Sequence, residues 1–231
     1  MSEFTKNIEK SGWQNVYRQY ANVLKAKADK MKEAKKKELM ELDKWYQNEL
    51  PDLISGRDEK YISHSEICQL MTWKLTRGKF RPRLQQMVSS NSEDDVKTAS
   101  LKAFKLLPNI SAAIQALTVL KAIGPATASA VLAAGCPDVP FMADESVLAL
   151  PGFATVDYNL KTYLEYSEKI REITKKLQKQ DTEFNWTGHK VEITLWTYYL
   201  GNKLIPDFQE KLDANNNESE STEPIIKKRK T

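Results

Sequence analysis

Two adjacent carboxylic acids, Asp144 and Glu145, follow the proline-rich stretch CPDVPFMA and stand where a short helix, predicted over residues 144–150, begins. A carboxylate at the start of a helix can cap free backbone N–H groups and is stabilised by the helix dipole, at about 1 kcal/mol. The same group can instead face a ligand, stabilise a developing positive charge or activate a water molecule. Both interpretations stay open for Asp144, whereas the dipole alone accounts for Glu145.

A stretch of small apolar residues precedes these carboxylates, AIGPATASAVLAAG at residues 122–135. The spacing of Gly124 and Gly135 fits no glycine-rich nucleotide loop, and no Lys-Ser or Lys-Thr pair follows a second glycine. Pro125 suits the first turn of a helix, and the alanines after it let a neighbouring helix approach closely. The first N–H groups of such a helix are free to bind an anion. The stretch therefore predicts a tight helical hairpin that can also hold a phosphate.

Five cations and no acid occur in WKLTRGKFRPR, residues 73–83, around Gly78. Cations in a loop and at a helix start suit the phosphates of a nucleic acid. Phe80 is available to stack on a base, while core packing is favoured for Trp73. The stretch predicts phosphate contacts by Lys74, Arg77, Lys79, Arg81 and Arg83.

The chain offers little to bind a metal or a cofactor. It has two cysteines, Cys68 and Cys136, and two histidines, too few for a disulfide framework, a thiolate zinc site or an iron–sulfur cluster. No calcium-loop pattern of carboxylates is present either. The sequence therefore predicts a protein without cofactor or metal.

The hairpin and the first carboxylate stand in a fixed relation, because Asp144 lies 20 positions after Gly124 and follows Pro140. Residues 117–147 resemble the helix-hairpin-helix superfamily of base-excision DNA glycosylases, in which an essential aspartate stands at this place, at the start of the next helix. Val147 also falls where the family has a valine. The hairpin pattern L-x-x-L-x-x-I-G-x-x-T-A-x-x-V-L is matched by Leu117, Leu120, Ile123, Gly124, Thr127, Ala128, Val131 and Leu132.

The resemblance implies an activity and a set of roles. Asp144 would be the catalytic carboxylate that hydrolyses the N-glycosidic bond of a base flipped out of the DNA duplex. The position of the lysine in lyase members is occupied by an alanine, so the implied enzyme is monofunctional, a hydrolase. The hairpin would contact DNA phosphates through Ile123, Gly124, Ala126 and Thr127.

One hairpin position differs from the family in a way that bears on the backbone. Ala122 stands where the family has its first hairpin glycine. If the turn requires a positive φ there, the Cβ costs on the order of 1 kcal/mol.

Apolar residues recur at three to four positions along nearly the whole chain, and glycine is scarce, at eight residues. These features predict an all-α fold. The sequence predicts one long helix, or two in near continuation, across 12–50, and a capping box at Ser63. It further predicts that Asp157 caps a helix over 158–179, and that Gly201 ends the last helix.

The expected organisation has four parts. They are a flexible N-terminus at 1–11, a long basic helical segment at 12–50 packed on the main domain, a helical glycosylase-like domain at 51–205 with its hairpin at 117–132, and a disordered tail at 206–231.

Charge and tail composition point to a nuclear protein with an anionic partner. The net charge is +4 and the pI is near 8.8, which favours double-stranded DNA bound through its phosphates. The terminal basic cluster is of the nuclear-import kind and predicts the nucleus, with the import machinery as a second partner. No apolar run approaches the about 18 residues of a membrane span, so no membrane partner is expected. The cluster consists of Lys227, Lys228, Arg229 and Lys230.

Two alternatives to the enzyme remain open. The first is a catalytically silent nucleic-acid-binding protein on the same scaffold. The second is an α-helical protein-interaction module, in which the segment 12–50 binds a partner and the hairpin serves packing alone.

Overall fold

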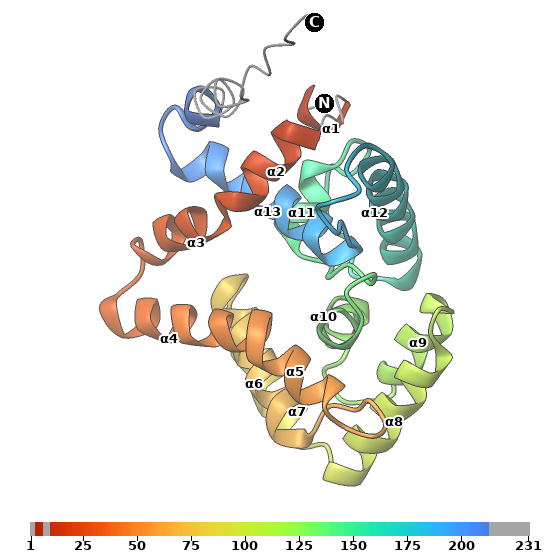
Figure 1. The fold of residues 1–231 in the computed structure, drawn as a ribbon. Helices are drawn as coiled ribbons and strands as arrows, with labels where there is room; N and C mark the ends of the chain where they lie inside the picture. Colours follow the sequence, from red (N-terminus) through yellow and green to blue (C-terminus); the bar gives the residue numbers. More distant parts are fainter. Residues whose placement is uncertain (1–2, 7–9, 213–231) are drawn as a thin grey trace, which may run out of the picture.

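The computed structural model of the 231-residue chain describes residues 3–6 and 10–212, and every regular element in them is helical (Figure 1). The all-α prediction is thereby confirmed. The elements are α1 Glu3–Lys6, α2 Lys10–Arg18, α3 Tyr20–Ala28, α4 Glu33–Lys44, the π-helical turn η1 Trp45–Glu49, α5 Leu50–Ser55, α6 His64–Arg77, α7 Pro82–Ser89, α8 Glu93–Leu106, α9 Ile110–Leu117, α10 Pro125–Gly135, α11 Asp144–Ala149, α12 Leu160–Gln180 and α13 Gly188–Leu204.

Helix α10 occupies the centre of the fold. It lies between the group α4–α9 and the group α11–α13 (Figure 1), and it contacts α5, α6, α8, α9 and α12. All of its residues from 126 to 135 are buried. Small side chains make this possible: a Cβ on Gly135 would lie 2.5 Å from the ring of Phe104. The predicted close packing around this helix is confirmed.

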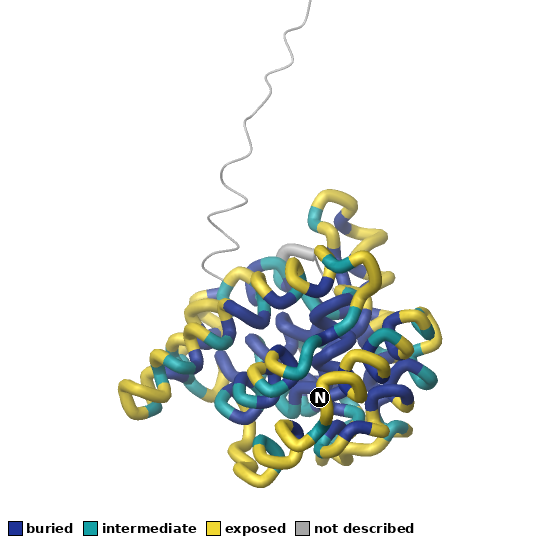
Figure 2. Tube along the Cα trace, turned by 90° about the horizontal axis from the view of Figure 1, so that it is seen from below, coloured by how far each residue is buried: buried dark blue, intermediate teal, exposed yellow. Residues whose placement is uncertain are grey.

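Large aromatic side chains fill the remaining interior. The buried stretches of the chain are dark blue in Figure 2. Trp73 is fully buried and stacks on Tyr46, with ring centroids 3.6 Å apart. Trp186 and Trp196 are also fully buried. Core packing was the prediction for Trp73, and it is correct.

The N-terminal segment 12–50 differs most from its prediction, which was one long helix or two in near continuation. Residues 12–50 form α2, α3, α4, η1 and the start of α5, with a break at residues 29–32 where Lys32 is extended. Neither glycine nor proline causes this break. Helix α3 packs against α13, whereas α4 packs against α6, and one straight helix cannot bury its apolar face against both partners.

Local capping signals located the start of α6 but not that of α12. Ser63 and Glu66 form the expected capping box: Ser63 Oγ accepts from the Glu66 N–H at 3.3 Å, and Glu66 Oε2 accepts from the Ser63 N–H at 2.8 Å. Asp157 is not the cap of α12, because Asn159 accepts the Thr162 N–H and the helix begins at Leu160.

The predicted end of the last helix is wrong as well. Helix α13 continues through Gly201 to Leu204. A Cβ on Gly201 would lie 2.4 Å from the ring of Phe208, so this glycine serves a close contact within the helix.

Both predicted flexible ends are partly ordered. Phe4 in α1 stacks on Trp13 and on Tyr198, and Phe208 and Leu212 are buried in a helical turn at 208–212. Ordering of these segments follows from their aromatic and aliphatic contacts. The rest of the tail, including the basic cluster, lies outside the described residues.

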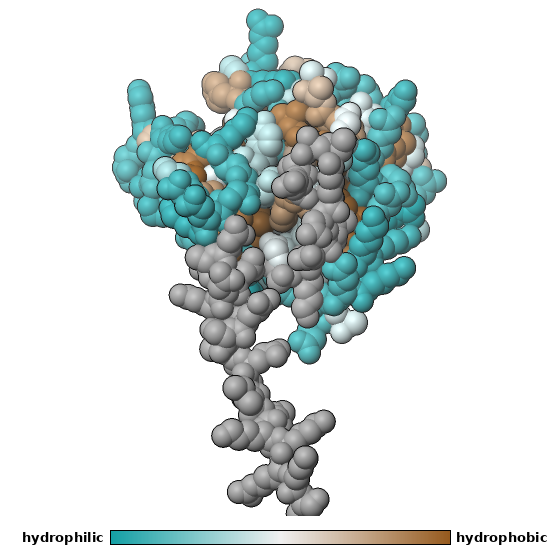
Figure 3. Space-filling model, turned by 90° about the horizontal axis from the view of Figure 1, so that it is seen from above, coloured by the Kyte–Doolittle hydropathy of each residue, from teal (hydrophilic) through white to brown (hydrophobic). Residues whose placement is uncertain are grey.

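The exterior is mainly polar. In the face drawn in Figure 3, hydrophilic side chains form the periphery and hydrophobic residues gather toward the middle. Within the described part of the chain, no helix is long and apolar enough to cross a membrane.

The turn between α9 and α10 places Ala122 in the left-handed region, with φ of 64°. Asn91 holds this turn from the side, since its Oδ1 accepts the Lys121 N–H at 2.8 Å and its Nδ2 donates to the Lys121 carbonyl at 3.2 Å. The strain at Ala122 is therefore retained by a fixed loop.

Replacing Ala122 with glycine is expected to stabilise the protein by about 0.5–1 kcal/mol, because relief of the left-handed Cβ outweighs the added freedom of the unfolded chain. Urea unfolding followed by circular dichroism measures the change. Ala133→Gly, inside α10, is the matched control and should destabilise. A loss of stability in both variants would contradict strain at Ala122.

Candidate nucleic-acid interface and active site

Three regions separate in the sequence meet around one cavity of about 440 Å³. They are the end of α6 with the loop after it, the turn before α10, and the segment that leads into α11. Tyr158 adds a further wall. The cavity thereby brings together nine of the residues selected from the sequence: Lys74, Arg77, Lys79, Arg81, Ile123, Gly124, Ala126, Thr127 and Asp144. Arg83 does not line it and is exposed in the first turn of α7.

The segment before α11 is fixed by hydrogen bonds to two helices. From α10, buried Ser129 accepts the Met142 N–H at 3.0 Å. From α12, Tyr163 donates to the Pro140 carbonyl at 3.2 Å, and Tyr166 donates to the Phe141 carbonyl at 3.1 Å. An extended segment held in this way positions the first residue of α11 relative to the centre of the fold.

The carboxylate of Asp144 faces side chains from outside its own helix. Ala143 is the residue that precedes α11, and it makes no side-chain cap. Tyr158 Oη donates to Asp144 Oδ1 and Oδ2, at 2.8 and 2.7 Å, and Lys79 Nζ lies 3.0 Å from Oδ2. Among the described residues, Asp144 is thus held by a phenol and an ammonium group, and the interpretation as a helix cap is wrong.

These contacts also set the protonation of the neighbouring groups. Burial, followed by the hydrogen bond to Asp144, raises the pKa of Tyr158, so its hydroxyl remains a donor at neutral pH. The hydrogen bond and the charge of Asp144 raise the pKa of Lys79. Arg81 lies over the Tyr158 ring, 5.0 Å from its centroid. The loop after α6 therefore contacts Asp144 through Lys79 and its partner Tyr158 through Arg81.

Phe80 and Lys79 are the outward-facing parts of this loop. Phe80 is 73% exposed and does not line the cavity. The Lys79 side chain is 69% exposed. Both are accessible to a large partner that covers the cavity mouth.

Arg77 differs from the other cations of the stretch, because it lies inside the protein with 3% of its surface exposed. Its guanidinium is 3.9 Å from carboxylates of Asp43 and Glu192 and 4.2 Å from the centroid of the Trp196 ring. Since its charge is balanced internally, the predicted phosphate contact does not fit Arg77.

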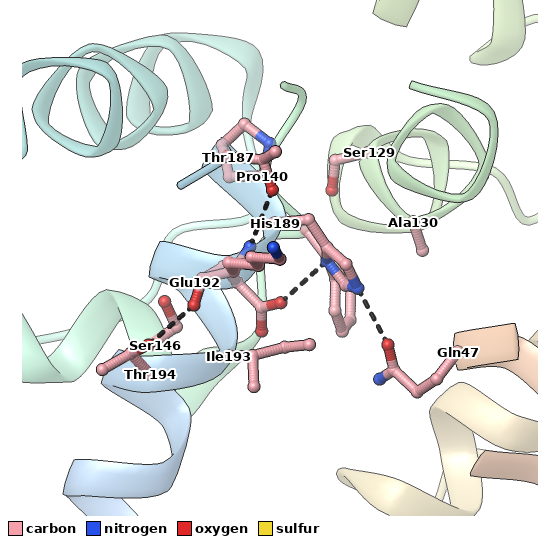
Figure 4. Close-up of polar contacts among 12 residues, drawn as sticks. Gln47, Ser129, Ala130, Pro140, Ser146, Thr187, His189, Glu192, Ile193 and Thr194 are labelled. Carbon is pink, nitrogen blue, oxygen red and sulfur yellow. Dashed lines mark hydrogen bonds and ion pairs between the residues drawn. The ribbon is translucent and has the colours of Figure 1, made fainter. Parts of the chain in front are cut away.

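The carboxylates around Arg77 belong to a buried polar network that the sequence analysis did not identify. Glu192 is wholly buried, and its Oε2 lies 3.3 Å from His189 Nδ1; the other ring nitrogen of His189 is 2.9 Å from Gln47 Oε1 (Figure 4). A signal was present: Glu192 precedes Leu195 and Trp196 by three and four positions, which places it on an apolar helix face.

The turn before α10 leaves two backbone donors unused. The N–H groups of Thr127 and Ala128 donate to the Gly124 carbonyl at 3.0 and 2.9 Å. Gly124 and Ala126 line the cavity, and their N–H groups form no hydrogen bond within the described part of the chain. Together with the dipole of α10, they offer donors to an anion. The Thr127 side chain is buried and takes no part in this.

Lys74 and Glu145 complete the polar wall. Lys74 is partly buried, and burial lowers its pKa, against the opposing charge of Asp144. Glu145 forms an ion pair with Lys27, at 3.6 Å. The N-terminal segment thereby contacts the residue next to Asp144.

The comparisons with known proteins give no match: neither a protein-family model nor a curated protein nor a solved structure matches this chain. The function is therefore inferred from the cavity and the residues around it.

Removal of the Arg77 charge should be far more damaging than removal of the Lys79 charge. Arg77→Ala leaves two buried carboxylates uncompensated, and we expect a loss of about 3–5 kcal/mol of unfolding free energy. Lys79→Ala breaks an exposed pair and should cost less than about 1 kcal/mol. Urea unfolding of both variants tests this, and equal losses would contradict an internal role for Arg77.

Proposed function

We propose that the protein is a DNA-binding enzyme of the glycosylase kind, a monofunctional hydrolase on a helix-hairpin-helix scaffold. The observation that carries the proposal is the shared cavity: the Asp144 carboxylate, the free N–H groups of the hairpin turn and the basic loop all line it. This combination suits a substrate that is anionic along its backbone and reacts at one carbon near a carboxylate.

DNA contact is assigned to the exposed part of the basic stretch and to the hairpin. Lys79, Arg81 and Arg83 are exposed and would bind phosphates, while the N–H groups of Gly124 and Ala126 would bind another. A phosphate near Lys79 would compete with Asp144 for the same ammonium group. Binding of DNA would then free the carboxylate for reaction.

The chemistry requires a flipped nucleotide in the cavity. A volume of about 440 Å³ lies within the range of about 300–1,000 Å³ of ordinary ligand sites. The Asp144 carboxylate would stabilise the positive charge that develops on the sugar as the N-glycosidic bond breaks, or would activate the attacking water. Tyr158 would hold the carboxylate by its hydrogen bonds during this step. The side chain of Ala126 has no amine, consistent with hydrolysis without lyase chemistry.

The nucleus remains the proposed location. It is supported by the proposed DNA partner and by the basic cluster of the tail, which would be recognised by the import machinery.

Base release from modified duplexes tests the enzymatic proposal. The full chain is incubated with duplexes that carry uracil, alkylated or oxidised bases, and the released bases are measured by mass spectrometry. We expect release from at least one duplex, reduced about 100-fold or more in Asp144→Asn. Glu145→Gln, the adjacent carboxylate, is the matched control and should retain activity. No release from any duplex, or equal release by Asp144→Asn, would remove the enzymatic proposal.

A second candidate, DNA binding without catalysis, is favoured by one observation. Lys79 and Tyr158 already occupy both oxygens of Asp144, as they would in a carboxylate with a purely structural role. On this proposal the same surface binds DNA and the carboxylate orders the loop after α6.

DNA binding measured against salt tests the surface that both candidates share. The logarithm of the affinity should fall steeply with the logarithm of salt concentration, and Arg81→Ala or Arg83→Ala should each reduce the slope by about 0.9. Lys176→Ala, an exposed lysine of α12, should leave the slope unchanged. A flat salt response of the unmodified protein would contradict both candidates.

A further inference from the structure

Lys74 stands out among the cations that line the cavity, because its donors are unused. Arg77 is paired with Asp43 and Glu192, Lys79 is paired with Asp144, and Arg81 covers Tyr158. The side-chain ammonium of Lys74 forms no hydrogen bond and no ion pair with another residue in the described ranges 3–6 and 10–212. These donors are free to bind acceptors of a ligand that enters the cavity.

The chemistry of Lys74 restricts what can face it. A charged lysine donates hydrogen bonds and accepts none, so the facing ligand atom must be an acceptor. Lys74 belongs to α6, and it lines the same cavity as Asp144. Uncharged nucleobases present carbonyl oxygens and ring nitrogens as acceptors, and in uracil the acceptors are carbonyl oxygens alone.

The cavity is also unsuited to a base that carries a positive charge. Apart from Arg77, whose charge Asp43 and Glu192 balance, the lining has the three cations Lys74, Lys79 and Arg81 against the two carboxylates Asp144 and Glu145. A cationic ligand would normally be held against free aromatic faces. The two rings of the lining are already approached by guanidinium groups, Phe141 by Arg77 at 5.8 Å and Tyr158 by Arg81 at 5.0 Å.

We propose that Lys74 is the base-recognising residue of this site and that the site takes an uncharged base with a carbonyl oxygen, such as a uracil or an oxidised pyrimidine, and rejects cationic alkylated bases. The inference rests on the proposed function, since it assigns a substrate class to the same cavity. It moves Lys74 from the phosphate-binding surface, where the sequence placed it, to the pocket for the flipped base.

A binding experiment tests this without any need for turnover. The full chain with Asp144→Asn is titrated, at neutral pH, with three duplexes that differ in one nucleotide opposite guanine: uracil, N3-methylcytosine, which is cationic, and a tetrahydrofuran that lacks a base. Fluorescence anisotropy gives the dissociation constants. We expect the uracil duplex to bind at least about fivefold more tightly than the N3-methylcytosine duplex, because the excess of cations in the cavity opposes a positive base.

A second variant assigns the discrimination to Lys74. Adding Lys74→Gln should weaken binding of the uracil duplex about tenfold and leave the tetrahydrofuran duplex nearly unchanged, since only the former presents a carbonyl oxygen. Lys176→Gln is the control for loss of one positive charge. Thermal unfolding of each variant checks the fold, and Lys74→Gln should not lower the midpoint because no hydrogen bond or ion pair is lost.

The outcomes separate this inference from the function on which it rests. Equal or tighter binding of the N3-methylcytosine duplex would overturn the proposed substrate class while leaving DNA binding intact. An equal loss for all three duplexes in Lys74→Gln would show that Lys74 binds a phosphate, which also overturns the inference. Failure to bind any duplex would overturn the inference and the proposed function together.

Discussion

The complete burial of α10 is the constraint on which the rest of the structure depends. Because residues 126–135 are all buried, five other helices pack around a cylinder that carries few large side chains. The hairpin turn before α10 must then bring the chain in from the surface within a few residues, and Ala122 adopts a left-handed conformation to do so. The same geometry leaves the start of α10 at the wall of the cavity. Packing and the proposed anion binding are thus two consequences of one arrangement.

The cations of the basic stretch that line the cavity do not share one environment. The four cations have different environments: Arg77 balances carboxylates in the interior, Lys74 lies in the cavity wall, Lys79 pairs with Asp144, and Arg81 covers the ring of Tyr158. Lys74 and Arg77 belong to α6, whereas Lys79 and Arg81 lie in the loop after the helix has ended. A basic stretch is therefore no uniform phosphate-binding surface. On the proposed function, each cation carries out a separate task.

Asp144 links these regions. Its backbone is placed by α10 and α12 through the extended segment before α11, and its carboxylate is held by Tyr158 and Lys79. In the absence of DNA the carboxylate therefore already has a partner of opposite charge. The proposed exchange of Lys79 from Asp144 to a phosphate would couple binding to exposure of the carboxylate. Glu145 has a different role, because its ion pair with Lys27 joins α11 to the N-terminal segment.

The sequence by itself determined those features that depend on neighbours along the chain. The helical class, the capping box at Ser63, Pro125 at the first turn of α10 and the hairpin of small residues all rest on contacts within about four positions, which a pattern reveals directly. The buried tryptophans followed from their apolar character. Only the tertiary structure decided the break between α3 and α4, the burial of Arg77 and the contact of Tyr158 with Asp144. Each of these depends on a partner distant in the sequence: α13 and α6 divide the N-terminal helix, the Asp144 carboxylate binds Tyr158 just before α12 begins, and Glu192 compensates Arg77 from across the core.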